Sequence, residues 1–197
     1  MKKSFFSLTV WILPFFLSGC SSTPPEPSSP SASPSAKVVE PAHPVKAYDV
    51  KKEDVTKVAE ITSPNFVVEG ISLGTPTKEI DKLLGKPIKV ETHGNTHRCA
   101  YRNYGLYLDV DKYTGKVTNI YLNTLYADNV KGDLSALLSK GNLELLKKSF
   151  GDNPAESQPD PNTTLWEYPK KGIMFLRMKQ GEDITFTLKL VQPRKIL

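Results

Sequence analysis

The segment TPTKEIDKLLGKP, at residues 75–87, has the pattern of a short amphipathic helix with a signal at each end. Ile80, Leu83 and Leu84 recur at the spacing that places side chains on one helix face. Thr75 is a suitable N-cap, the proline after it suits the first helical position, and Gly85 suits the C-terminal cap. We therefore expect a helix that ends at Gly85 and packs its apolar face against a core.

A similar pattern recurs later in the chain. Asn142 can cap a second helix, apolar residues follow at helical spacing, and Gly151 can end it. A shorter helix is expected just before it, over residues 133–141, where leucines share one face. Its counterpart in the first half would be residues 51–60.

Seven segments after these helices have the alternating or apolar pattern of β-strands. They lie at residues 88–92, 96–101, 105–110 and 116–122 in the first half, and at 164–168, 172–178 and 183–190 in the second. The halves keep a nearly constant offset, since Gly85 precedes Gly151 by 66 residues and Gly105 precedes Gly172 by 67. This offset predicts an α+β fold of two tandem repeats, at 48–127 and 128–197.

The first half also resembles a known family. GISLG at 70–74, the helix after it, YGLYLD at 104–109 and GKVTNI at 115–120 are similar to the SmpA/OmlA repeat. That superfamily includes the BamE-type assembly lipoproteins and the tandem-repeat β-lactamase inhibitory proteins. The match is close over 66–123 and weaker over 131–190, where the leading Gly-Ile-x-Leu-Gly is missing. The resemblance implies helices on one face of an antiparallel sheet and, for a tandem pair, two sheets that form one concave surface.

The first twenty residues predict the precursor of a lipoprotein. A basic start and an apolar run too short to span a bilayer are typical of a secretory signal. Leu17-Ser18-Gly19-Cys20 then resembles the bacterial lipobox, with a signal peptide at 1–19 that is cut before the cysteine. The resemblance implies a diacylglyceryl cysteine at Cys20, whose palmitate or similar acyl chains hold the protein on a membrane. The alternative is an ordinary secretory signal with a chance cysteine.

Residues 20–47, which comprise the lipidated cysteine and a stretch rich in proline and serine, are expected to form a disordered linker. Ser21 resembles the outer-membrane sorting signal, which would place the protein on the periplasmic side of the outer membrane in a two-membrane host. A single-membrane host would display it at the cell surface. Beyond the linker, basic and acidic residues are interspersed without a basic stripe, so we expect no nucleic-acid partner.

His93, His97 and Cys99 have a spacing that could hold zinc or copper. However, Gly94-Asn95 between two extended runs predicts a two-residue hairpin loop. In such a hairpin the two histidines point to opposite faces, because strand side chains alternate. We therefore expect surface histidines, a buried thiol, and no metal or other cofactor, although a longer loop would permit a site.

The remaining polar patterns do not predict catalysis. DVDKYTG at 109–115 begins like a calcium loop, but its glycine is one position late and Ile120 replaces the expected glutamate. We interpret it as a turn between two strands. A catalytic serine or cysteine needs a base within reach, and the few histidines include one in the linker. We expect that the protein is not an enzyme.

The sheet face opposite the core carries unusual side chains. Strand alternation places Tyr107 and Tyr121 on that face in the first half, and Met174 and Met178 in the second. A solvated sheet face is normally polar, whereas tyrosine and methionine are enriched at interface cores. These four residues therefore predict a protein-binding surface. The alternative is that the other repeat covers them.

Together these patterns predict a membrane-anchored cell-envelope lipoprotein that acts as a non-enzymatic protein-binding module. Its partner would be another envelope protein or a secreted protein. A role in envelope assembly or as a scaffold and inhibition of a secreted enzyme both fit the sequence. The alternative class is a small-ligand or metal-binding envelope sensor that uses His93, His97 and Cys99.

Overall fold

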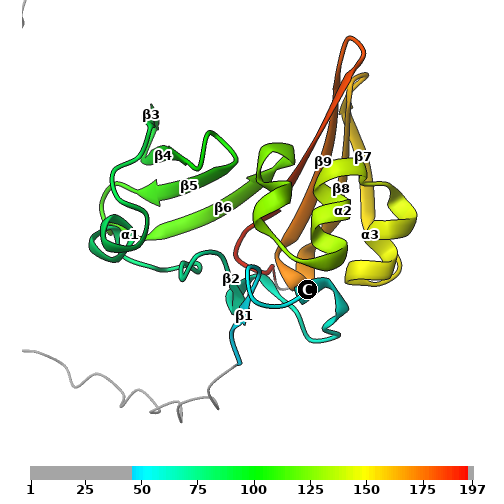
Figure 1. Cartoon of the computed structure of the whole chain (residues 1–197). Coiled ribbons are helices and arrows are strands. Elements are labelled where there is room, and N and C mark those ends of the chain that lie inside the picture. The colour runs from blue at the N-terminus through cyan, green and yellow to red at the C-terminus, as the bar shows by residue number, and fades with distance from the viewer. Residues whose placement is uncertain (1–45, 195–197) are drawn as a thin grey trace, which may run out of the picture. The chain divides into compact units, whose positions relative to one another are not determined.

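The computed structural model describes residues 46–194, which include three α-helices and ten β-strands (Figure 1). The predicted signal peptide at 1–19, the lipidated Cys20 and nearly all of the linker at 20–47 lie outside the described residues. Within the described part, no helix has the length and hydropathy that a membrane span requires.

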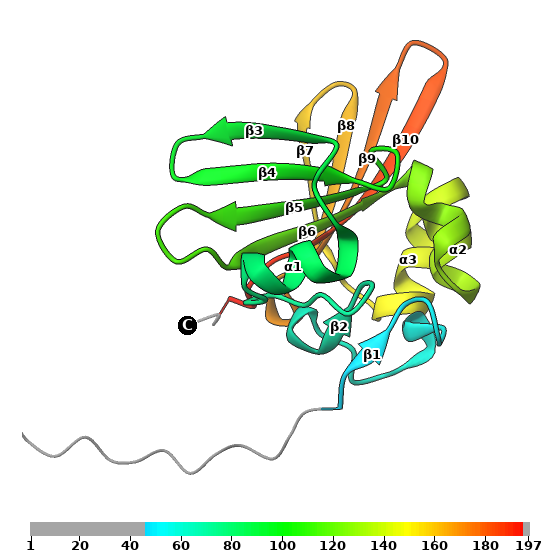
Figure 2. The ribbon, with the colours of Figure 1, turned by 60° about the vertical axis from the view of Figure 1, so that its left-hand side comes forward.

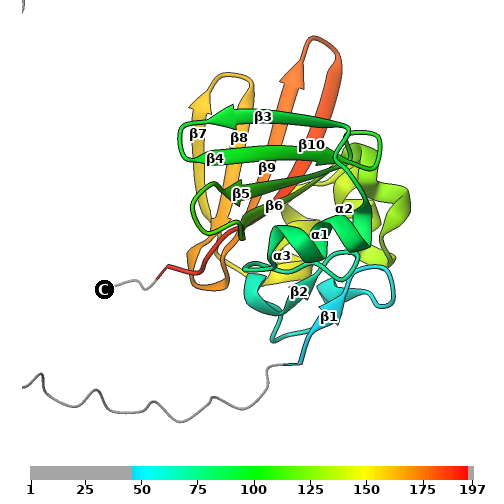
Figure 3. The same ribbon diagram turned by 90° about the vertical axis from the view of Figure 1, so that its left-hand side faces the viewer.

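Eight strands form one antiparallel sheet in the order β3-β4-β5-β6-β10-β9-β8-β7. They are β3 (Lys89–His93), β4 (Thr96–Tyr101), β5 (Leu106–Asp111), β6 (Val117–Asn123), β7 (Ala155–Asp160), β8 (Thr163–Tyr168), β9 (Ile173–Gln180) and β10 (Asp183–Leu190). The two halves of the chain meet where β6 pairs with β10, with Leu122 opposite Leu188. Strands β3 and β4 run crosswise to β9 and β10, so the sheet is strongly twisted (Figure 3).

The expected fold class is therefore wrong. Two tandem repeats were expected, each with helices on its own small sheet, whereas the eight strands form a single sheet. Two short strands, β1 (Tyr48–Asp49) and β2 (Phe66–Val67), form a separate parallel pair. Separate sheets would leave β6 and β10 as open edges with unpaired N–H and C=O groups, and their pairing removes both edges.

The helices begin and end close to the predicted positions. Helix α3 (Leu143–Phe150) is capped by Asn142, whose Oδ1 accepts a hydrogen bond from the backbone N–H of Leu145 at 2.9 Å. Gly151 ends it with a φ of 102°, as expected. Helix α1 (Thr77–Leu84) has Pro76 as its N-cap, because the Thr75 hydroxyl accepts the N–H of Ser72 in the preceding turn instead.

The helices near the start of each half differ more from expectation. Helix α2 (Gly132–Lys140) is not capped by a side chain of its own first residues. Instead, the carboxylate of Asp54 accepts a hydrogen bond from the Asp133 backbone N–H at 3.0 Å. The helix expected over 51–60 is wrong, because that segment forms only a short 3₁₀ turn at Val55–Lys57. Its buried Val55 joins the core without a helix.

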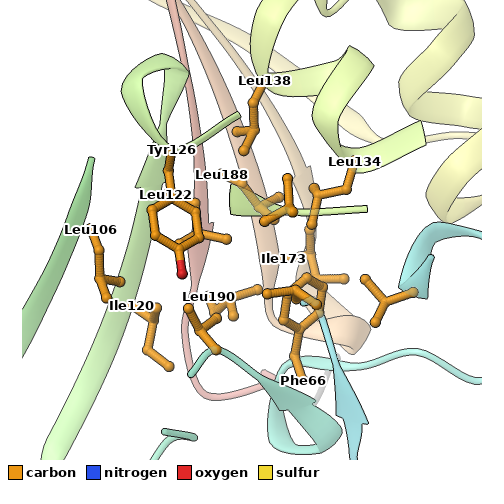
Figure 4. Close-up of a cluster of buried hydrophobic side chains, with 14 of the residues drawn as sticks. Phe66, Leu106, Ile120, Leu122, Tyr126, Leu134, Leu138, Ile173, Leu188 and Leu190 are labelled. Atoms are coloured by element: carbon orange, nitrogen blue, oxygen red, sulfur yellow. The ribbon is translucent and has the colours of Figure 1, made fainter. Parts of the chain in front are cut away.

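One hydrophobic core lies between the sheet and the helices (Figure 4). It joins both halves of the sheet to α2 and to the N-terminal segment. The labelled side chains in Figure 4 are Phe66, Leu106, Ile120, Leu122, Tyr126, Leu134, Leu138, Ile173, Leu188 and Leu190. Because β6 and β10 lie side by side, Ile120 and Leu122 of β6 pack in the same core as Leu188 and Leu190 of β10. This shared burial of apolar side chains is a second reason why the sheet is continuous.

All three helices pack on the same face of this sheet (Figures 1 and 2). Helix α1 contributes Ile80 and α2 contributes its leucines to the core on that face. We call the opposite face the open face. Side chains alternate between the two faces along a strand. A residue that follows or precedes a core residue therefore points onto the open face.

Candidate functional site

A groove runs across the open face of the sheet, and we call it the open-face groove. It encloses about 570 Å³ and draws its lining from six strands, β3 to β6, β9 and β10. Its lining side chains are Glu91, Arg98, Tyr107, Tyr121, Asn123, Met174, Leu176, Met178, Thr187 and Lys189. A smaller hollow of about 200 Å³ shares Glu91, Arg98 and Tyr107 with it and extends toward Tyr104.

The groove brings together the four residues predicted from strand alternation. Tyr107 lies opposite Tyr121 in the β5–β6 ladder, and Lys189 of β10 lies between Tyr121 and Met174. Met178 stands farther along β9 and is 39% exposed. The placement of these residues on one surface follows the prediction, while their role in binding a protein stays a prediction.

A polar network centred on Asp109 forms the floor of the groove beside Tyr121. Asp109 is only 4% exposed although it lies on the open face. Its carboxylate accepts hydrogen bonds from Arg98 Nε at 2.8 Å and Nη2 at 3.1 Å, from Asn119 Nδ2 at 2.9 Å and from the Tyr121 hydroxyl at 2.6 Å. The buried charge is therefore paired and fully hydrogen-bonded, which is the arrangement that makes its burial tolerable.

Ionisation in this network is fixed by the same contacts. Burial acts to raise the pKa of the Asp109 carboxyl, but the hydrogen bonds from Arg98, Tyr121 and Asn119 together hold that pKa below its usual range. Burial and the hydrogen bond to Asp109 raise the pKa of the Tyr121 hydroxyl. Near neutral pH the carboxylate is charged and the tyrosine is neutral, so the floor gives no poised acid or base.

Tyr121 also contacts two cations through its ring. The Arg98 guanidinium lies 4.7 Å from the ring centroid, and the Lys189 ammonium lies 5.2 Å from it. Arg98 in addition donates from Nη2 to the Tyr121 hydroxyl at 2.9 Å. Tyr121 is thus held on several sides, and it is a structural part of the floor as well as a lining residue.

The turn between β4 and β5 borders the smaller hollow beside the groove, through Tyr104. Arg102, Asn103 and Tyr104 all have positive φ angles, between 51° and 65°, which non-glycine residues rarely adopt. Hydrogen bonds hold this turn, since Arg102 Nε donates to Glu69 at 3.0 Å and Asn123 Nδ2 donates to the Tyr104 carbonyl at 2.7 Å. The turn places the Tyr104 ring beside that of Tyr107, with 6.5 Å between the ring centroids.

The three residues proposed for a metal site do not meet. Thr92 pairs with His97 and His93 pairs with Thr96, so the hairpin at Gly94-Asn95 has the predicted register and the histidines lie on opposite faces. His97 and Cys99 share the helix-side face, and burial raises the pKa of the Cys99 thiol. Among residues 46–194, no group of three His, Cys, Asp or Glu side chains is arranged to hold a metal ion.

The segment at 109–115 contains the predicted turn between two strands, but only residues 112–115 form it, because 109–111 belong to β5. The Asp111 carboxylate accepts the N–H groups of Tyr113 at 3.1 Å and of Thr114 at 2.8 Å, which closes the turn between β5 and β6. Gly115 completes it with a φ of 64°. Asp109, the first residue of the calcium-like pattern, points instead to Arg98 on the open face.

Sequence reasoning missed Arg98, Asp109 and Lys189 as parts of this site. A signal existed for the first two, because alternation with Cys99 and Leu108 places both on the open face, and an aspartate within an apolar strand requires a partner. Lys189 had no comparable signal. Its place beside Tyr121 depends on the pairing of β6 with β10.

No family model matches the chain, and no curated protein matches it either. Two solved structures are similar to parts of it. A DUF4309 family protein (YjgB) from Bacillus subtilis is 12% identical over 62% of this chain and 83% of that chain, with a TM-score of 0.39. A cysteine-rich secretory protein from Staphylococcus aureus is 11% identical over 75% of this chain and 50% of that chain, with a TM-score of 0.37. Similarities this low carry no argument about function.

Proposed function

We propose that this protein is a membrane-anchored lipoprotein of the cell envelope that binds another protein in the open-face groove and performs no catalysis. The resemblance of residues 17–20 to the bacterial lipobox supports the anchor and, with it, a place in the envelope. Envelope assembly and inhibition of a secreted enzyme are the two forms that this role can take.

The composition of the groove is the observation that carries the proposal. Apolar side chains of Met174, Leu176 and Met178 line one side of it, and Tyr107 lies on the other. Methionine and tyrosine are residues that interfaces favour, because methionine adapts its shape and tyrosine adds a large contact area. A sheet face that only met water would be expected to carry polar residues in these positions.

The extent of the groove favours a polypeptide over a small molecule. Its lining residues span six adjacent strands, which at the usual strand spacing is about 24 Å across the sheet. A single small molecule would contact only part of this length. An extended or helical segment of a partner would contact all of it.

Site-directed photo-crosslinking in the native host tests the binding role. A benzoylphenylalanine placed at Tyr107 or at Met178 should yield a discrete crosslinked product with an envelope or secreted protein. Tyr113 is the matched control, since it is an aromatic residue of the β5–β6 turn that is 80% exposed and lies outside the groove. Equal products at Tyr113 and the groove positions, or none from the groove, would refute the proposal.

A separate experiment tests the anchor. Cells fed a palmitate analogue should label the wild-type chain, while the Cys20→Ala variant should take up no label and keep its signal peptide. Labelling that persists in the Cys20→Ala variant would show that the lipid is not on this residue.

A further inference from the structure

Lys189 differs from the other charged residues of the open-face groove. Its side chain is half-buried, and no carboxylate among residues 46–194 lies within 4.0 Å of its ammonium group. Its ammonium group faces the Tyr121 ring, with Nζ 5.2 Å from the ring centroid. Burial lowers the pKa of Lys189, which reflects incomplete replacement of the water that it loses.

The nearby carboxylates are occupied or distant. Asp109 already accepts hydrogen bonds from three side chains. Glu91 forms an ion pair with Lys89, with 2.6 Å between Oε1 and Nζ. Glu167 pairs with Met174, which in turn pairs with Lys189, so it stands two strands away from the lysine. In the part of the chain that the structure describes, the positive charge of Lys189 therefore has no carboxylate in direct contact, and Asp109 and Glu167 act on it only at longer range.

Apolar side chains flank this charge on both sides. Tyr121 lies opposite Lys189 on β6, and Met174 lies opposite it on β9. The spacing between neighbouring strands is about 4.8 Å. Leu176 and Met178 continue the apolar side along β9. A complementary ligand would thus have an anionic group with apolar groups on either side of it.

We propose that the open-face groove binds a segment of its partner protein in which one acidic side chain lies between apolar side chains, with the carboxylate on Lys189. This inference rests on the proposed protein-binding function and specifies the chemistry of the partner. A fatty acid would offer the same carboxylate but only one apolar tail. The apolar residues on both sides of Lys189 favour the peptide.

The test uses an array of 12-residue peptides with leucine, phenylalanine or tyrosine on either side of a central glutamate. Matched sets carry glutamine or lysine at the centre. The purified full chain, in its wild-type form and as the Lys189→Met, Lys189→Arg and Lys112→Met variants, is the probe. Lys112 is an exposed lysine of the β5–β6 turn and serves as the control.

Wild type should bind the glutamate peptides at least about ten-fold more tightly than the glutamine peptides, as expected for a charge-assisted hydrogen bond. In Lys189→Met the ratio of glutamate-peptide to glutamine-peptide affinity should fall to about one, while both peptides still bind through their apolar side chains. Lys189→Arg and Lys112→Met should keep the preference for glutamate.

Equal binding of glutamate and glutamine peptides by wild type would overturn the inference. The protein-binding function would still stand in that case if the crosslinks from Tyr107 and Met178 are found. Stronger displacement of the peptides by dodecanoate than by free glutamate peptide would also overturn it and would assign the groove to a fatty acid. Absence of both peptide binding and crosslinks would refute the inference and the proposed function together.

Discussion

Removal of the Asp109 carboxylate should destabilise the folded protein by about 3 kcal/mol. The carboxylate accepts four hydrogen bonds from three side chains at 2.6 to 3.1 Å, and Asp109 is 4% exposed. Hydrogen bonds to a charged group contribute about 1.5–3 kcal/mol each, so a simple sum would exceed this figure. Breaking a buried ion pair costs about 3–5 kcal/mol. The Arg98 side chain is 37% exposed and regains water when its partner is lost, so we expect a cost near the lower end of that range.

Urea unfolding of the full chain, followed by circular dichroism, measures this cost for Asp109→Ala. Asp111→Ala is the matched control, because Asp111 lies on the same strand but accepts hydrogen bonds from an exposed turn. It should destabilise the protein clearly less than Asp109→Ala. The double variant with Arg98→Met should be less unstable than the sum of the single variants, since both changes break the same ion pair.

A loss below about 1 kcal/mol for Asp109→Ala, or one equal to that of Asp111→Ala, would contradict the reasoning. It would mean that water already satisfies Arg98 and Tyr121 in the folded protein. The floor of the groove would then be a solvated surface rather than a paired and buried network.

Three further predictions concern other parts of the chain. Asn142→Ala should cost about 1 kcal/mol in urea unfolding, because it removes the cap of α3. Gly172→Ala should lower the melting temperature, since Gly172 has a φ of 67° and an added Cβ would collide with the Val191 carbonyl; a wild-type melting temperature would be the contrary result. Glu69 supplies a pH dependence: burial acts to raise its pKa, but hydrogen bonds, Arg102 foremost, lower it to about 2. A carboxyl with a depressed folded pKa stabilises the fold above its unfolded value of 4.5, and this stabilisation is lost as the pH falls toward 2. Urea midpoints between pH 5 and pH 2 should therefore change less in Glu69→Gln than in wild type.

Local pattern located most of the strands. The segments expected at 96–101 and 183–190 have those bounds in the structure, and four others begin one residue later than expected. The pattern failed at β7, whose sequence AESQPD has no apolar alternation because every one of its residues is exposed at the edge of the sheet. An edge strand that buries nothing leaves no hydrophobic signal in the sequence.

The arrangement of the strands was not predictable in the same way. Periodicity says which face of a strand is apolar, and it does not say which strand lies beside it. The union of the halves depends on β6 and β10, which are separated in the chain by both later helices and three strands. Their pairing is favoured by tertiary terms, namely the removal of two open edges and the joining of one core.

The same limit explains what was found and missed at the site. Tyr107, Tyr121, Met174 and Met178 follow from alternation within single strands, so they could be predicted without knowledge of the strand order. The relation of Lys189 to Tyr121 could not, because it exists only across the β6–β10 pairing. The charge that we assign to partner recognition is thus the feature that most requires the structure.

The floor and the walls of the groove should respond differently to substitution. Arg98, Asp109 and Tyr121 are tied together by short hydrogen bonds and a cation–π contact, so changes there disturb the fold and the groove together. Met178 and Tyr107 make none of these bonds and are partly exposed, so changes there should leave the free energy of unfolding nearly unaltered. A rigid polar floor keeps the strands in place, while flexible methionines can adapt to a partner. Wall variants that lose crosslinking at unchanged stability would therefore separate a binding surface from a piece of the core, whereas wall variants that unfold the protein would show that these side chains stabilise the sheet.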